Sequence, residues 1–277
     1  LRTRFAMRRG AWISVVLAIV LAGTAAWWWW RQPTPPIATV PVEAPASQAA
    51  MAPPAASAAV SGIQHPIETP SESGAAADPK TALVDLFGAR VALSMFHLDD
   101  FPHRFAATAD NLGRSSAPSH VWPVVPPSGR FIVERAGDGE VIAADNSLRY
   151  APFVLMVESV DAAHLAATYR RLYPLLQQAY EDLGYPGRYF NDRVVAVIDI
   201  LLATPTIDAR PKVHLPTIDP SVHPERPWVL YQFDDPALES LTAGQKMLLR
   251  MGPENERRLK AKLVEIRRLL ATPKAPR

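Results

Sequence analysis

Two aspartates, Asp192 and Asp199, accompany the apolar run VVAVIDILLA at residues 194–203. Their spacing of seven residues places both carboxylates on one face of a helix. Together with Glu158, they are the carboxylates that could act as the acid and the base of a hydrolase. The polar side chains near them that could bind a ligand are Tyr185, Arg188 and Asn191.

The same two aspartates also have structural interpretations, and the sequence leaves these open. Arg188 precedes Asp192 by four residues and could form an ion pair with it on a solvent-facing stripe. Asp199 could pair with an arginine from another helix. Structural carboxylate pairs are more common than catalytic ones, so we favour these interpretations.

Four potential metal ligands lie within seven residues, but their spacing does not suit a metal site. They lack the i, i+4 histidine pair of a zinc helix, and Pro102 interrupts them. Asp100, just before Phe101 and Pro102, is better explained as a helix cap. We therefore predict no metal and no cofactor. The four residues are His97, Asp99, Asp100 and His103.

Common catalytic motifs are absent from the sequence. It contains no nucleophile elbow, no P-loop, no dinucleotide-binding glycine pattern and no zinc-protease motif. An enzyme is not excluded by this, but a noncatalytic protein is favoured. The aromatic residues that could line a groove have helical spacing typical of a core; they are Tyr169, Tyr173, Tyr180, Tyr185 and Tyr189.

An uncharged stretch at residues 11–30, AWISVVLAIVLAGTAAWWWW, has the length of a transmembrane helix. Arginines are concentrated before it, which predicts that residues 1–10 lie in the cytoplasm and the later residues in the periplasm. A cleaved signal peptide is the alternative, because Gly23-Thr24-Ala25 resembles a cleavage site. We expect an uncleaved anchor in a bacterial inner membrane.

After the anchor, a Pro/Ala-rich segment at 31–78 predicts a disordered linker, because it has too little periodic apolar surface to fold. Residues 79–271 then predict one predominantly helical α+β domain, and 272–277 a flexible tail. The expected helices are 81–95, 100–112, 161–183, 189–203, a short one from Pro236, 242–252 and 253–270. The expected strands are a hairpin on either side of 136–139, then 213–215 and 228–233.

Two stretches, YRRLYPLLQQAYEDLGYPGRYFNDRVVAVIDILLATP at 169–205 and LESLTAGQKMLLRMGPENERRLKAKLVEIRRLL at 238–270, carry a family resemblance. They resemble the bacterial domain of unknown function 3014, loosely across residues 85–270. The resemblance implies a membrane-anchored envelope protein. It implies no activity and no functional residues.

Charge and composition narrow the range of partners. The net charge is +2, and the basic residues outside the arginine-rich N-terminus are balanced by acids, so we expect no nucleic-acid partner. The C-terminal helix is basic and could touch anionic lipid, although solvated basic side chains explain it as well. We expect a noncatalytic interaction module that binds an envelope protein or peptidoglycan. The alternative is a periplasmic hydrolase that uses the paired carboxylates.

Overall fold

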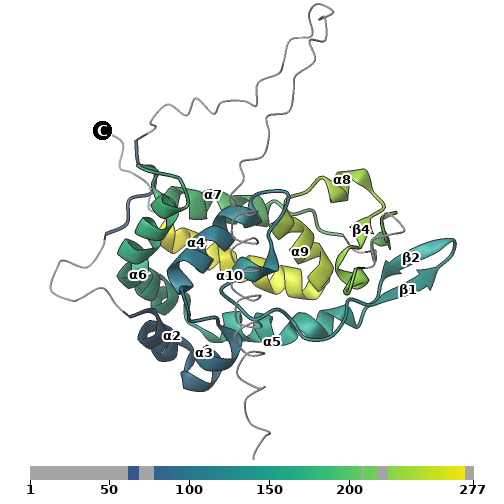
Figure 1. Cartoon of the computed structure of the whole chain (residues 1–277), viewed down its shortest axis with the longest axis horizontal. Coiled ribbons are helices and arrows are strands. Elements are labelled where there is room, and N and C mark those ends of the chain that lie inside the picture. Colours follow the sequence, from purple (N-terminus) through teal and green to yellow (C-terminus); the bar gives the residue numbers. More distant parts are fainter. Residues whose placement is uncertain (1–61, 69–77, 208, 218–223, 272–277) are drawn as a thin grey trace, which may run out of the picture. The chain divides into compact units, whose positions relative to one another are not determined.

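A computed structural model describes residues 62–68, 78–207, 209–217 and 224–271, all within one compact unit (Figure 1). The expected cytoplasmic segment (1–10), transmembrane helix (11–30), tail (272–277) and most of the linker (31–78) lie outside the described residues. Within the described ranges, no helix has both the length and the apolar character that a membrane span requires.

The described part is mostly helical with one small antiparallel sheet, which confirms the α+β class. The longer helices are α4 (Phe101–Leu112), α5 (Asn146–Ser159), α6 (Ala162–Asp182), α7 (Phe190–Leu202) and α10 (Pro253–Leu270). The shorter ones are α2 (Pro79–Phe87), α3 (Ala89–Met95), α8 (Pro236–Glu239) and α9 (Ala243–Met251), with 3₁₀ turns at Ser119–Val121 and Pro227–Val229.

The last helix, α10, joins several of the other helices. It contacts α5, α6, α7 and α9, and α4 lies against both α6 and α7. Figure 1 shows the strands at the α8 and α9 end of the domain, with α2 and α6 at the other end. The buried tyrosines of α6, Tyr169, Tyr173 and Tyr180, belong to the largest hydrophobic cluster, which confirms their interpretation as core residues.

The sheet has the order β1-β2-β3-β4, and every neighbouring pair is antiparallel. Its strands are β1 (Val133–Ala136), β2 (Gly139–Ile142), β3 (Lys212–His214) and β4 (Gln232–Phe233). The β1–β2 hairpin was predicted, and Gly137 at its turn has a φ of 63°, which glycine adopts without strain. Val213 pairs with Glu140 on one side and Phe233 on the other, which joins the hairpin to the later strands.

The strand predicted at 228–233 is largely wrong. Pro227–Val229 forms a 3₁₀ turn, and only Gln232 and Phe233 pair with β3. Pro227 has no N–H for a ladder and its fixed φ suits the first position of a helical turn, so it starts the turn instead.

Two helical segments also differ from prediction. The helix expected from 81 to 95 is divided at Gly88, whose φ of 81° interrupts the helix and whose N–H caps Val84. Helix α5 was not predicted; it contains Pro152, whose missing N–H removes one helical hydrogen bond. Pro152 lies on the exposed side, and the packing of α5 on α10 compensates for the missing hydrogen bond.

Side-chain caps mark the start of three helices. Asp78 and Asp161 each accept a hydrogen bond from the backbone N–H of the third residue of the helix, and Thr242 and Gln245 form a capping box at the start of α9. These caps fix where α2, α6 and α9 begin.

Asn146, at the start of α5, ties that helix to the chain entering β1. It is 1% exposed; its side chain accepts a bond from the Ile132 N–H at 3.0 Å and donates to the carbonyl oxygens of Ile132 and Ala143. Asn146→Ala leaves these groups buried without partners, so we expect a loss of about 2 kcal/mol of unfolding free energy. Thermal melting monitored by circular dichroism measures it, with the exposed Ser94→Ala as a near-neutral control. Equal melting temperatures for the two variants would contradict the role of Asn146.

Candidate functional site

Asp199, the carboxylate inside the apolar run, lies on the surface and pairs with Arg267 of α10. Both of its oxygens bond the guanidinium group, and its side chain is 47% exposed. The hydrogen bond from Arg267 holds the pKa of Asp199 below its usual value. Of the interpretations that the sequence left open, the structure therefore shows the bridge to another helix.

Asp192 makes no ion pair with Arg188 in the described part of the chain. Its two oxygens instead accept the backbone N–H groups of Gln64 and His65, at 3.0 and 2.7 Å. Residues 62–68, within the segment predicted as linker, are thus held against α7. Asp192 thus accepts hydrogen bonds from two backbone N–H groups that would bond to water if the segment were not attached to the domain.

Glu158 on α5 pairs with Arg258 of α10, whose hydrogen bond lowers the pKa of Glu158. The three carboxylates that were candidates for a hydrolase site thus have three different partners. A general acid needs a carboxyl group whose pKa is raised toward neutrality. For Asp199 and Glu158 the shift has the opposite sign, so both stay ionised at neutral pH.

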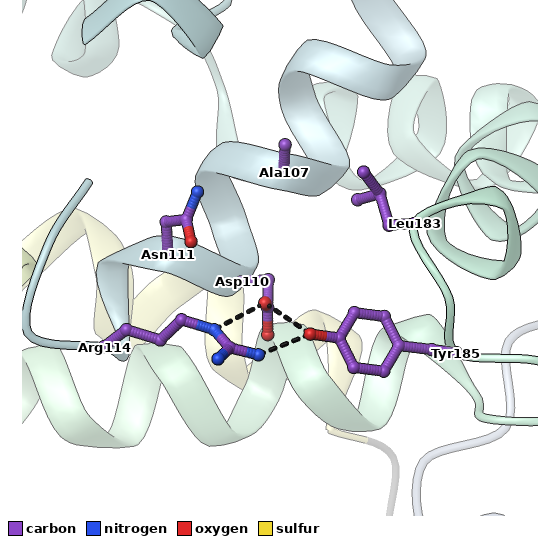
Figure 2. A pocket seen from close by; sticks show the side chains of 6 residues that line it. All are labelled: Ala107, Asp110, Asn111, Arg114, Leu183 and Tyr185. Atoms are coloured by element: carbon purple, nitrogen blue, oxygen red, sulfur yellow. Dashed lines mark hydrogen bonds and ion pairs between the residues drawn. The ribbon is translucent and has the colours of Figure 1, made fainter. Parts of the chain in front are cut away.

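Of the predicted ligand-binding residues, Tyr185 lines an open pocket of about 200 Å³ (Figure 2). Asn191 is buried beneath the attached segment, and Arg188 contributes its carbonyl oxygen to Gln177. The residues that line the pocket are Ala107, Asp110, Asn111, Arg114, Leu183 and Tyr185.

A buried carboxylate, Asp110 in the last turn of α4, organises this pocket. Its Oδ2 accepts bonds from Arg114 Nε at 2.8 Å and from the Tyr185 hydroxyl at 3.1 Å, and its Oδ1 accepts from Arg193 Nε at 2.8 Å. Arg193 of α7 also bonds the Asp110 carbonyl oxygen. Near the carboxyl end of a helix a negative charge is unfavourable, so these two arginines are needed to stabilise it.

Gly113, which ends α4, leaves room for the Arg193 guanidinium group. A Cβ at this position would lie 2.9 Å from Arg193 Nη2 and 3.1 Å from Val197 Cγ2. The turn also directs the next residue, Arg114, back to Asp110 at i, i+4. The sequence Asp110–Arg114 therefore builds one side of the pocket locally, and Leu183 and Tyr185, between α6 and α7, complete it.

Tyr185 is held as a neutral phenol. Burial raises its pKa, and the nearby Asp110 charge raises it further. Its hydroxyl donates to Asp110 and accepts a bond from Arg114, and its ring stacks on Tyr180 with centroids 4.5 Å apart. Tyr185 thus orients Arg114 and cannot serve as a base near neutral pH.

The pocket presents positive charge to a small acceptor. Arg114 is half exposed, and two of its three guanidinium nitrogens are used, by Asp110 and Tyr185. The remaining N–H groups and the Asn111 amide suit a carboxylate, with Ala107 and Leu183 as apolar walls (Figure 2). Typical ligand pockets measure about 300–1,000 Å³, so this one fits an end group rather than a whole cofactor.

Asp110, Arg114 and Arg193 were missed by the sequence analysis. Asp110 lies in a polar stretch of sequence, which did not predict that its side chain is buried. Asp199 lies in an apolar run, which suggested burial, but its side chain is half exposed. The one available signal was the i, i+4 pair of Asp110 and Arg114 around Gly113. Arg193 could be assigned only once α4 and α7 were placed together.

The predicted cap at Asp100 is wrong. Asp100 has a φ of 56° and makes no capping bond; its carboxylate instead contacts His103 Nδ1 at 2.5 Å. His103 Nε2 contacts Asp182 of α6 at 3.2 Å, so the imidazole bridges two helices. Among the described residues, no cluster of acids and histidines has the geometry of a metal site.

Comparison with known proteins identifies a family and no function. Residues 101–267 match the model of a family described as protein of unknown function (DUF3014), which confirms the resemblance seen in the sequence. No curated protein and no solved structure matches. The pocket residues all lie inside the matched region, whereas residues 62–68 lie outside it.

Removing the Asp110 charge should destabilise the domain more than removing the Asp199 charge. Asp110→Asn leaves Arg193 partly buried without its counter-charge, so we expect a loss of about 2–4 kcal/mol. Asp199→Asn breaks a surface pair and should cost less than about 1 kcal/mol. Urea unfolding of both variants measures the difference. Equal losses would show that Asp110 is no more constrained than a surface acid.

The His103 bridge should stabilise the domain more at acidic than at basic pH. Hydrogen bonds to Asp100 and then Asp182 raise the pKa of His103. When folding raises the pKa of a histidine, its protonated form stabilises the folded state. This contribution to the unfolding free energy is fully present below the pKa of the unfolded chain, about 6.5, and is lost as the pH rises through the higher pKa of the folded protein. The imidazole is 44% exposed, so the effect is small, about 0.5 kcal/mol. His103→Gln should lower the melting temperature at pH 5.5 and much less at pH 9; equal decreases would contradict the bridge.

Proposed function

The chain belongs to the DUF3014 family of proteins of unknown function, and from that premise we propose that it is a noncatalytic binding module. Its ligand is a carboxylate group of a larger molecule, held by Arg114 with Asn111 beside it. An acidic envelope protein or a peptidoglycan peptide presents such a group.

The observation that supports this proposal is the fixed position of Arg114. Asp110 and Tyr185 each bond its guanidinium group, so the side chain is oriented before a ligand arrives. An oriented arginine loses less conformational entropy on binding than a free one, and its planar N–H groups match a carboxylate. Because Asp110 is balanced by both Arg114 and Arg193, the cluster keeps an excess positive charge.

A hydrolase receives less support from the geometry. Glu158 and Asp199 are paired with arginines, and Asp192 accepts two backbone N–H groups. Within the pocket, Asp110 is occupied by three donors, which leaves no carboxylate there to transfer a proton.

The location of the module is part of the proposal. The apolar segment at 11–30, with arginines concentrated before it, supports an inner-membrane anchor with the domain in the periplasm. The Pro/Ala-rich residues that follow would then let the pocket reach partners away from the membrane surface.

Replacing Arg114 should abolish carboxylate binding. We expect N-acetylalanine to shift the amide NMR signals of Asn111 and Arg114 with a millimolar Kd, which is ordinary for so small a ligand. N-acetylalaninamide has the same shape without the charge and should bind at least about tenfold more weakly. Arg114→Gln should weaken N-acetylalanine binding by a similar factor.

The matched control is Arg267→Gln, which removes another arginine that pairs with an aspartate, here the exposed Asp199, and that lies outside the pocket. It should leave the titration unchanged. Equal binding of the acid and the amide, or undiminished binding by Arg114→Gln, would contradict the proposed function.

A further inference from the structure

Residues 62–68 are held on the domain by side chains that bind their main chain. Asp192 accepts the N–H groups of Gln64 and His65, and the Tyr189 hydroxyl accepts the N–H of Ile67 at 2.7 Å. Asn191 Nδ2 donates to the His65 carbonyl oxygen at 2.9 Å. Among the described residues, each hydrogen bond between this segment and the domain thus joins a domain side chain to a backbone group of the segment.

Two of the three receiving side chains are positioned by the domain itself. Asn191 is fully buried; its Oδ1 accepts from the Tyr169 hydroxyl, and its Nδ2 also donates to the Leu270 carbonyl oxygen. Tyr189 packs on Tyr173, with ring centroids 5.3 Å apart. A site that is built before its occupant binds is able to accept another occupant of the same shape.

The side chains of the segment contribute little to its recognition. Ile63, Gln64, Pro66 and Glu68 are exposed, and Ile67 alone packs against the main hydrophobic cluster. Pro66 has no N–H, and no acceptor is needed at its position. The site therefore recognises three backbone N–H groups, those of Gln64, His65 and Ile67 in this chain. It also accepts an apolar side chain at the position of Ile67.

The segment is an imperfect occupant. His65 Nδ1 is buried, and among the described residues no hydrogen-bond partner reaches it. A buried polar atom without a partner weakens binding. A segment with an apolar side chain at this position would keep every main-chain bond and avoid that cost.

We propose that Tyr189, Asn191 and Asp192 form a binding site for a short main-chain segment of a partner protein, and that residues 64–67 occupy it in cis as a competitor. Nine residues of sequence separate Glu68 from Asp78, and for so short a separation the effective concentration is about 1 mM. A partner segment binds when its own affinity overcomes this competition, and residues 64–67 are then released from their site.

The test uses the full chain and a labelled peptide with the sequence of Gly62–Ile67, acetylated and amidated so that it carries no carboxylate. The Arg114 pocket therefore cannot account for its binding. Ile67→Asp in the chain expels the cis segment from the core cluster, and this variant should bind the peptide in fluorescence anisotropy. For a Kd of about 10 μM, the wild-type chain should bind about 100-fold more weakly.

Three changes test the recognition itself. A peptide with leucine at the His65 position should bind about tenfold more tightly. A peptide with N-methyl groups on the backbone nitrogens of His65 and Ile67 should lose binding. The Ile67→Asp chain, whose site is opened, should likewise lose binding of the unmodified peptide when Asp192→Asn is added to it. Asp199→Asn, the same change on the same helix, should leave binding intact.

His65→Pro gives a second opened chain, because it removes one donor N–H without placing a charge beside the core. Both opened variants should bind the peptide. Failure of a folded opened chain to bind it, or equal binding of the N-methylated peptide, would overturn the proposal. N-acetylalanine binding tests the Arg114 pocket, and peptide binding tests the site formed by Tyr189, Asn191 and Asp192. Each proposal can therefore be contradicted without the other.

Discussion

The buried carboxylate of Asp110 is the constraint on which the pocket depends. Removing a carboxylate from water costs several kcal/mol unless opposite charges and hydrogen bonds replace its hydration. Here Arg114, Arg193 and Tyr185 supply them, from the residues after α4, from α7 and from the loop between α6 and α7. One charged group therefore fixes the relative positions of three segments. The same bonds orient Arg114 toward the pocket, so the stability of this region and its proposed ability to bind an anion have one physical cause.

Ion pairs along α10 explain why its basic character is not a free cationic surface. Arg258 pairs with Glu158 of α5, and Arg267 pairs with Asp199 of α7. Within the helix, Lys260 pairs with the almost fully buried Glu256 at i, i+4. These contacts join α10 to the helices that it packs against. They leave less positive charge for anionic lipid, and they occupy the carboxylates that a hydrolase would need.

The sequence predicted local features better than long-range ones. The β1–β2 hairpin needs only neighbouring residues and was predicted, although the cap at Asp100, which is equally local, does not form. Helix α5 was not predicted. It contains Pro152, and the packing on α10 that offsets the lost hydrogen bond comes from residues far along the chain. Burial of Asp110 and exposure of Asp199 likewise depend on which helices meet. The bridge from Asp199 to another helix could be stated as an alternative, but its partner, Arg267, could not be identified.

A double-mutant cycle between Asp110 and Arg193, with unfolding free energies from urea titrations, tests the central interaction most directly. The four proteins are the wild type, Asp110→Asn, Arg193→Gln and the double variant. A buried charge pair with 2.8 Å contacts should give a coupling free energy of about 1.5–3 kcal/mol, with the double variant more stable than the sum of the single losses implies. Additive losses would show that Asp110 does not depend on Arg193, and the account of the pocket would then be wrong.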